Sequence, residues 1–130
     1  MNRMNHDVRQ DSKSMHNLFV YGTLKRGQTN HFFLAGLPAK LAKAPQIVLH
    51  TGKDYPFARR GKGITYGEVY YINHRLLTKI DRLERHPDLF QRELTTVILL
   101  PKRIHIEAWI YLHKQARRHP RVMKGHWQNR

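Results

Sequence analysis

Hydrophobic, β-branched and aromatic residues occur along this chain in short runs that are typical of strands. One run, Leu18–Tyr21, ends at a glycine, and a second, Ile64–Ile72, is rich in β-branched and aromatic side chains. Two later runs, residues 90–100 and 103–112, meet at Pro101-Lys102, which is typical of a hairpin turn. Every second residue of the last run is apolar, a period that indicates a half-buried strand. These residues are Ile104, Ile106, Ala108, Ile110 and Leu112.

One clear helix is predicted between the strands. Asn73 suits the N-cap position and Pro87 stops a helix, so we expect the helix to run from Asn73 to about His86. Residues 30–36 are predicted to form one or two helical turns. Residues 37–63 contain several prolines and glycines and favour short strands with loops. The predicted fold class is therefore α+β: a small β-rich domain, a closed or nearly closed mixed barrel, with one main helix and short flanking helices.

The length of 130 residues corresponds to one domain. Residues 1–16 lack apolar periodicity and are predicted to be a flexible leader, residues 17–112 to form the domain, and residues 113–130 to form a tail. No apolar run approaches the roughly 20 residues of a membrane-spanning helix, and the leader lacks the apolar centre of a secretory signal. The absence of cysteine excludes disulfides and thiolate chemistry. We therefore expect a cytoplasmic protein with no membrane partner.

Positive charge is the most unusual feature of the composition. Lys and Arg number 24 against 9 Asp and Glu, so the formal net charge is +15. A positive field of that size attracts nucleic acid, acidic proteins and anionic substrates. The predicted tail contains six Lys or Arg residues and no acid. Through this tail we expect weak, non-specific binding of nucleic acid or other anions.

Most kinds of catalytic side chain can be eliminated. The serines, Ser12 and Ser14, lie in the predicted leader, and no GxSxG, P-loop or HExxH motif occurs. The ten histidines lack the spacing of a helical zinc pair. The motifs therefore predict no metal site, and the nine carboxylates remain as candidates for catalysis.

Glu84 differs from the other carboxylates in its position on the predicted helix. At about 100° per residue, its side chain falls on the apolar face, between Leu77 and Ile80. An ionised carboxylate without a partner is costly there, so either its pKa rises or it lines a cavity. In the alternative, the last helical turn unwinds and Glu84 pairs with Arg92 or Arg85. From the pattern alone this alternative is the more ordinary one, because a carboxylate with a perturbed pKa indicates a functional site in some proteins and an ordinary ion pair in others.

Several segments resemble the γ-glutamylcyclotransferase-like (AIG2-like) family, and they follow one another in the order found in that family. Residues 19–31 contain Tyr-Gly-Thr-Leu and resemble the opening strand and loop. Gly67-Glu-Val-Tyr, Asp81-Arg-Leu-Glu84 and Leu89-Phe-Gln-Arg92 resemble the strand, helix and return strand, and Ala108-Trp-Ile-Tyr111 resembles the closing strand. The resemblance covers about residues 18–112 and is closest to the γ-glutamylamine cyclotransferase branch.

The resemblance implies a barrel of the family type and a cyclotransferase without a cofactor. Such an enzyme cleaves a γ-glutamyl amine or amide: the α-amine of the substrate attacks its own γ-carbonyl, which releases 5-oxoproline and a free amine. Glu84 matches the catalytic acid/base of the family. Two residues depart from the family pattern, because many members have glycine in place of Arg85 and tyrosine in place of Phe90. The implied substrate-binding residues are Tyr21, Gly22, Thr23, Leu24, Phe90 and Tyr111.

Two alternatives stay open at the level of the sequence. Core packing at a strand end explains Tyr21 and Leu24 as well as substrate contact does. A non-catalytic basic module for RNA or acidic protein could use the same fold, with Tyr66, Tyr70 and Tyr71 as stacking surfaces. No RRM or KH signature is present, however. An assay for 5-oxoproline release separates the enzyme from the binding module.

Overall fold

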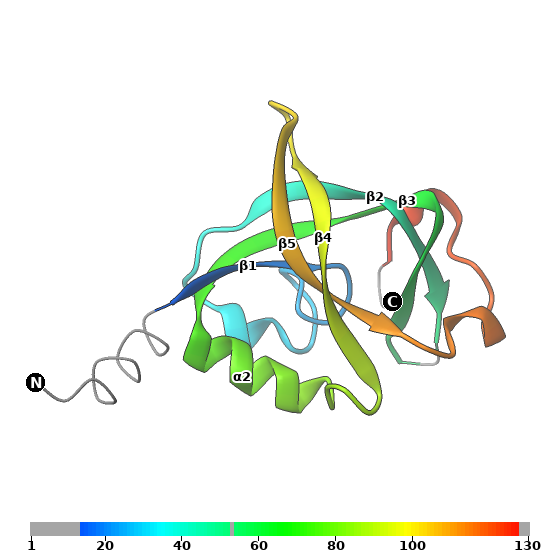
Figure 1. The fold of residues 1–130 in the computed structure, drawn as a ribbon, viewed down its shortest axis with the longest axis horizontal. Coiled ribbons are helices and arrows are strands. Elements are labelled where there is room, and N and C mark those ends of the chain that lie inside the picture. Colours follow the sequence, from blue (N-terminus) through cyan, green and yellow to red (C-terminus); the bar gives the residue numbers. More distant parts are fainter. Residues whose placement is uncertain (1–13, 53, 128–130) are drawn as a thin grey trace, which may run out of the picture.

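The computed structural model describes residues 14–52 and 54–127 and contains a five-stranded mixed barrel in the order β1-β3-β2-β4-β5 (Figure 1). No helix in these residues is both long and apolar enough to cross a membrane. The predicted β-rich barrel with one main helix and short flanking helices is confirmed. The strands are β1 (Met15–Val20), β2 (Lys40–Thr51), β3 (Pro56–Asn73), β4 (Phe90–Leu99) and β5 (Ile104–His113). The helices are α2 (His74–Leu83) and the single-turn 3-10 helices η1 (His31–Leu34), η2 (Ala116–Arg118) and η3 (Met123–Gly125).

The barrel is closed unevenly, so it is better described as a strongly twisted sheet whose edges meet. The antiparallel hairpins β2–β3 and β4–β5 are paired along most of their length. In contrast, β2 joins β4 only through Ala42 and Lys43, and β1 joins β5 in parallel only at Leu18 opposite Trp109. Because so few backbone pairs join β2 to β4 and β1 to β5, side-chain packing holds these two pairs of strands together.

Residues 37–63 form longer strands than the predicted short strands with loops. Pro45 interrupts the β2–β3 ladder, and the register shifts between Pro45 and Ile47, where Gln46 has a φ of 62°. Between the pair of Pro45 with Ile64 and the pair of Ile47 with Arg60, β2 has one residue and β3 has three, so β3 bulges beside the proline and β2 continues to Thr51. Proline and glycine are common to bulges and loops, so the local sequence does not distinguish the two here.

The helix α2 begins where the sequence predicted. The side chain of Asn73 accepts a hydrogen bond of 2.8 Å from the Leu76 N–H, which satisfies one of the free donors of the first helical turn. The backbone of Asn73 itself is extended, as a capping residue requires. The predicted N-cap is therefore confirmed.

The same helix ends earlier than predicted. The N–H groups of Arg85 and His86 donate to the carbonyls of Arg82 and Asp81, at 3.1 and 2.9 Å. This pair of bonds is a Schellman motif, with Arg85 in the left-handed conformation at a φ of 55°. The helix therefore stops at Leu83 rather than near residue 86.

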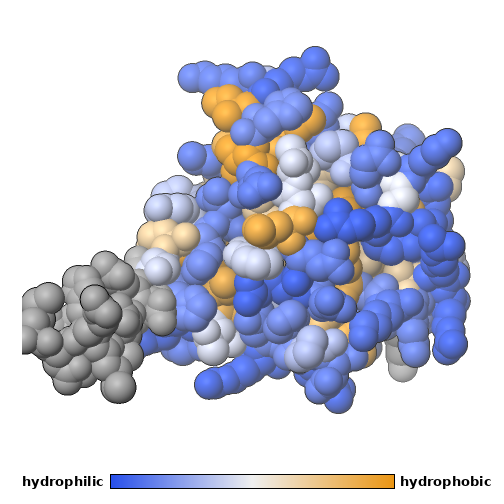
Figure 2. All heavy atoms as spheres, viewed as in Figure 1, coloured by the Kyte–Doolittle hydropathy of each residue, from blue (hydrophilic) through white to orange (hydrophobic). Residues whose placement is uncertain are grey.

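Two groups of buried side chains flank the sheet. One fills the barrel and includes Phe19, Ile47 and Ile110, and the other lies between the sheet and α2 and includes Leu18, Tyr70 and Ile80. Successive residues of β1 enter opposite groups because side chains alternate along a strand. Outside these groups, hydrophilic side chains cover most of the face in Figure 2.

The segment after β5, for which a basic tail was expected, packs against the barrel. Trp127 is only 6% exposed and belongs to the group that fills the barrel. The N–H of Val122 donates to the Leu49 carbonyl at 2.8 Å, and the Thr51 N–H donates to the Pro120 carbonyl at 2.7 Å. The apolar side chains of Trp127 and Val122 thus anchor this segment to the barrel, although the segment also carries many basic side chains. The expected leader, residues 1–16, lies mostly outside the described residues.

Replacing Trp127 should destabilise the whole barrel. We expect Trp127→Ala to lower the free energy of unfolding by about 3 kcal/mol, because it removes a large buried side chain and leaves a cavity. Met123→Ala is a matched control in the same segment, since Met123 is 79% exposed and should change stability by less than about 0.5 kcal/mol. Denaturant unfolding measures both. Equal stability of the two variants would show that the C-terminal segment does not belong to the folding unit.

Candidate active site

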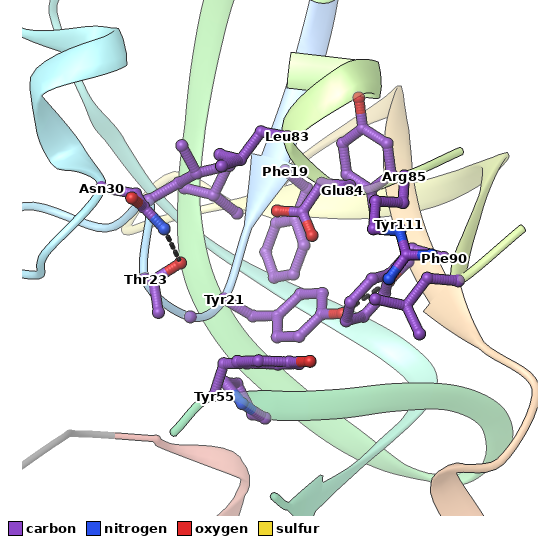
Figure 3. A pocket seen from close by; sticks show the side chains of 15 residues that line it. Phe19, Tyr21, Thr23, Asn30, Tyr55, Leu83, Glu84, Arg85, Phe90 and Tyr111 are labelled. Atoms are coloured by element: carbon purple, nitrogen blue, oxygen red, sulfur yellow. Dashed lines mark hydrogen bonds between the residues drawn. The ribbon is translucent and has the colours of Figure 1, made fainter. Parts of the chain in front are cut away.

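A cavity of about 280 Å³ opens where the end of β1, the start of β3, the end of α2 and the start of β4 converge (Figure 3). Every residue predicted for catalysis or substrate binding lines this cavity. Segments far apart in sequence are therefore brought together at one place. The seven predicted residues are Tyr21, Gly22, Thr23, Leu24, Glu84, Phe90 and Tyr111.

Several other lining residues were not predicted. Asn30 carries a structural role: its side-chain amide donates to Thr23 Oγ1 at 2.9 Å, and its N–H donates to the Thr23 carbonyl at 2.9 Å. Tyr55 and Pro56 arrive at the cavity only because the long β2–β3 hairpin folds back, which no local pattern predicts. The other lining residues are Phe19, Val20, Leu83, Arg85 and Leu89.

Glu84 is the C-cap of α2, and its side chain points into the cavity. No hydrogen bond or ion pair joins its carboxylate to any of the described residues. Burial raises the pKa of this carboxyl group from 4.5 to about 7. The structure thus has the predicted cavity-lining carboxylate, and it does not have the alternative in which Glu84 pairs with Arg92 or Arg85.

Asp81 explains why Arg92 does not pair with Glu84. The guanidinium of Arg92 donates to both carboxylate oxygens of Asp81, at 2.9 and 3.2 Å, and lies 4.1 Å from the centre of the Trp109 ring. The Tyr111 hydroxyl donates to the same carboxylate at 2.6 Å. Two-point pairing of this kind is strong and directional. Arg92 is therefore held beside the cavity and its charge is compensated there.

Two of the three tyrosines that line the cavity, Tyr21 and Tyr111, keep their protons near neutral pH. Tyr21 is buried and its hydroxyl donates to the Tyr111 carbonyl, and burial, followed by the charge of Glu84, raises its pKa well above the usual value. Burial and the Asp81 hydrogen bond likewise raise the pKa of Tyr111. Both phenols therefore remain protonated, and Glu84 is the lining group whose proton is exchanged near neutral pH.

Backbone donors in the loop that follows β1 have no partner among the described residues. The N–H groups of Thr23 and Leu24 donate to no other described residue. A Cβ on Gly22 would lie 2.8 Å from the side chain of Pro56, so the glycine is required where the loop and β3 meet. Tyr21 and Leu24 are buried core residues as well as lining residues, so the packing alternative and the cavity placement hold together.

The C-terminal segment supports this loop from the other side. Trp127 belongs to the same buried group as Phe19 and Tyr21, and its carbonyl accepts a hydrogen bond of 2.6 Å from the Lys25 ammonium. Lys25 lies directly after the loop residues that line the cavity, and its N–H donates to the Gly22 carbonyl at 3.0 Å. The segment therefore fixes the loop at the same time as it covers the barrel.

Metal chemistry has no obvious site in the described part of the chain. No group of three or more His, Cys, Asp or Glu side chains lies close enough there to hold a metal ion. The arrangement in the cavity instead suits proton transfer: one carboxyl group with a near-neutral pKa, surrounded by aromatic and aliphatic walls.

Comparison with known proteins places the chain in a family. Residues 18–129 match the family model described as γ-glutamyl cyclotransferase, AIG2-like. A Drosophila melanogaster protein named for the γ-glutamylcyclotransferases is 40% identical over 108 residues, which cover 73% of this chain and 68% of that protein. The γ-glutamylaminecyclotransferase A of Danio rerio is 33% identical over 108 residues, or 73% of this chain and 67% of its own length.

Solved structures share the same architecture. An AIG2-like protein from Mus musculus superimposes with a TM-score of 0.69 at 25% identity, covering 88% of both chains. YkqA from Bacillus subtilis gives a TM-score of 0.72 at 24% identity, over 88% of this chain and 40% of the YkqA chain, and supports the fold alone. The barrel and these relatives together define an enzyme of the cyclotransferase class. The chain belongs to the AIG2-like γ-glutamyl cyclotransferase family, as its sequence predicted.

The raised pKa of Glu84 predicts a pH-dependent stability. Between about pH 4.5 and 7 the folded chain keeps a proton that the unfolded chain has lost, so this contribution to stability is complete below about pH 4.5 and is lost as the pH rises through 7. Relative to Glu84→Gln, the wild type should therefore lose on the order of 3 kcal/mol of stability across this window. Denaturant unfolding at several pH values measures the difference. A difference that does not vary with pH would contradict the raised pKa.

Proposed function

We propose that this chain cyclises γ-glutamyl amines or amides and releases 5-oxoproline and a free amine, with Glu84 as the general acid/base. One observation carries the proposal: a carboxylate without a partner among the described residues points into an apolar cavity, and burial raises its pKa to about 7. The Danio rerio relative is named for the γ-glutamylamine reaction, which supports this substrate class. In this proposal the substrate contacts the β1 loop, Phe90 and Tyr111.

The reaction removes two protons from the α-nitrogen and adds one to the leaving nitrogen. The α-nitrogen of the substrate forms a bond to the γ-carbonyl carbon, and the bond from that carbon to the leaving nitrogen breaks. Ionised Glu84 accepts one proton from the α-ammonium group before the attack and returns it to the leaving nitrogen. The ring nitrogen still carries one proton too many after the attack, and the freed Glu84 carboxylate accepts that second proton and passes it to solvent. A carboxyl group serves in both directions when its pKa lies close to the working pH.

The remaining task is to hold the substrate in a folded-back conformation, because nucleophile and electrophile belong to one molecule. The rings of Tyr21, Tyr55 and Phe90 provide walls for that purpose. The N–H groups of Thr23 and Leu24 are free to donate to the oxyanion that develops at the γ-carbonyl. The Asn30 side chain supports the loop that carries them.

Removing the proton carrier should abolish turnover without unfolding the chain. Glu84→Gln keeps the shape of the side chain, and we expect its rate of 5-oxoproline release to fall by about 10² or more. Glu93→Gln is a matched control, because Glu93 pairs with Arg60 and does not line the cavity. Its rate should stay within a few-fold of the wild type. If Glu84→Gln retains a comparable rate while folded, the assignment of the acid/base fails.

We also infer an anion-binding surface at the C-terminal segment, in addition to catalysis. The Arg59 guanidinium donates to His50 Nε2 at 2.9 Å and that of Arg121 donates to the Lys62 carbonyl at 2.8 Å, while neither has a carboxylate partner among the described residues. Burial, and then the neighbouring charges of Arg117 and Arg121, lower the pKa of Arg59. Three unneutralised guanidinium groups thus lie close enough to repel one another, which favours weak binding of phosphates.

This surface can be tested against a charge-matched control. Arg117→Gln with Arg121→Gln should weaken binding of a labelled single-stranded oligonucleotide and reduce its salt dependence, by roughly 0.7 in the logarithmic slope for each phosphate that the variant no longer binds. Arg75→Gln with Arg82→Gln removes the same charge from the exposed face of α2 and should have a smaller effect. Fluorescence anisotropy over a salt series measures both. Equal effects of the two double variants would mean that net charge, not this surface, governs binding.

A further inference from the structure

Arg85 occupies a position in which an arginine is unfavourable. Its backbone is fixed in the left-handed region by the end of α2: its N–H donates to the Arg82 carbonyl at 3.1 Å and its carbonyl accepts from the Leu89 N–H at 2.9 Å. A residue with a side chain loses roughly 1 kcal/mol in this conformation, whereas glycine does not. The helix end would thus be more stable with glycine, so backbone geometry does not explain the arginine.

The charge of Arg85 is unused within the described structure. Among the residues that line the cavity, Glu84 and Arg85 are the two that can carry a full charge near neutral pH. The guanidinium of Arg85 makes no hydrogen bond and no ion pair with a described residue, and the side chain is exposed. Burial alone accounts for the raised pKa of Glu84, so Arg85 does not neutralise its neighbour. The cation remains free for an anion that a ligand brings.

Arg85 lies on a different side of Glu84 from the β1 loop. In Figure 3 the Glu84 carboxylate lies between Thr23 and Asn30 on one side and Arg85 and Phe90 on the other. The β1 loop reaches the first side with Thr23, and its N–H donors suit the γ-glutamyl head, where the oxyanion develops. The amine that leaves must then extend from Glu84 toward Arg85 and Phe90, since Glu84 has to reach both nitrogens.

We propose that Arg85 determines specificity for the leaving group, by binding a carboxylate on the amine that the reaction releases. The proposal rests on the cyclotransferase function proposed above. Favoured substrates are then γ-glutamyl conjugates of amino acids, in preference to conjugates of neutral amines of the same size. A guanidinium forms its strongest hydrogen bonds with carboxylates, and the net charge of +15 attracts such substrates from solution.

A pair of substrates that differ in one group tests this role. γ-Glutamyl-alanine and γ-glutamyl-alaninamide have leaving groups of equal size, with a carboxylate in the first and a carboxamide in the second. We expect kcat/KM of the wild type, measured by 5-oxoproline release, to favour the carboxylate by about tenfold. In Arg85→Gln this ratio should fall to about one, in Arg85→Lys it should be intermediate, and in Arg82→Gln, on the exposed face of α2, it should be that of the wild type.

The outcomes separate this proposal from the function on which it rests. Turnover of both substrates by the wild type without preference, or an unchanged ratio in Arg85→Gln, overturns the role of Arg85 while leaving the cyclotransferase intact. Turnover of neither substrate overturns both proposals. Arg85→Gly guards against a folding artefact, because it removes the guanidinium and the backbone strain together. Its melting temperature should rise while its substrate ratio also falls to about one.

Discussion

The paired side chains of Asp81 and Arg92 set the electrostatic state of the cavity. Arg92 donates to both oxygens of Asp81 and rests its guanidinium on the Trp109 ring, and the Tyr111 hydroxyl donates to the same carboxylate. In a chain with 24 cations and 9 acids, a buried carboxylate would ordinarily attract one of those cations. Because Asp81 retains Arg92, Glu84 has no ionic partner among the described residues, and burial alone decides its pKa.

The end of α2 fixes the position of Glu84 in the cavity. The Schellman motif stops the helix at Leu83 and reverses the chain, so that the Phe90 N–H donates to the Glu84 carbonyl and β4 starts beside the cavity. Glu84 is thus held by backbone hydrogen bonds on both sides while its side chain stays free. A catalytic group benefits from such an arrangement, since the backbone fixes its position and no side-chain partner competes for its proton.

Local patterns determined a large part of the molecule. The strand at residues 104–112, the cap at Asn73 and the apolar-face position of Glu84 depend on neighbours within one or two turns, and the structure has all three, although the second half of β5 is buried on both faces. The Tyr-Gly-Thr-Leu loop and the segments around residues 81–92 identified the family in the same way. Such features can be recognised in a sequence because backbone hydrogen bonding and side-chain periodicity repeat over short distances.

Long-range contacts decided what the sequence left open. Whether Glu84 is paired depends on Asp81 reaching Arg92 across the junction of α2 and β4, and both pairings were compatible with the sequence. Tyr55 joins the cavity through a hairpin whose bulge has no local signature. The docking of Trp127 depends on a space inside the barrel that exists only once five strands have closed. A sequence states which groups a chain carries, whereas the choice among partners follows from distances that only the folded chain creates.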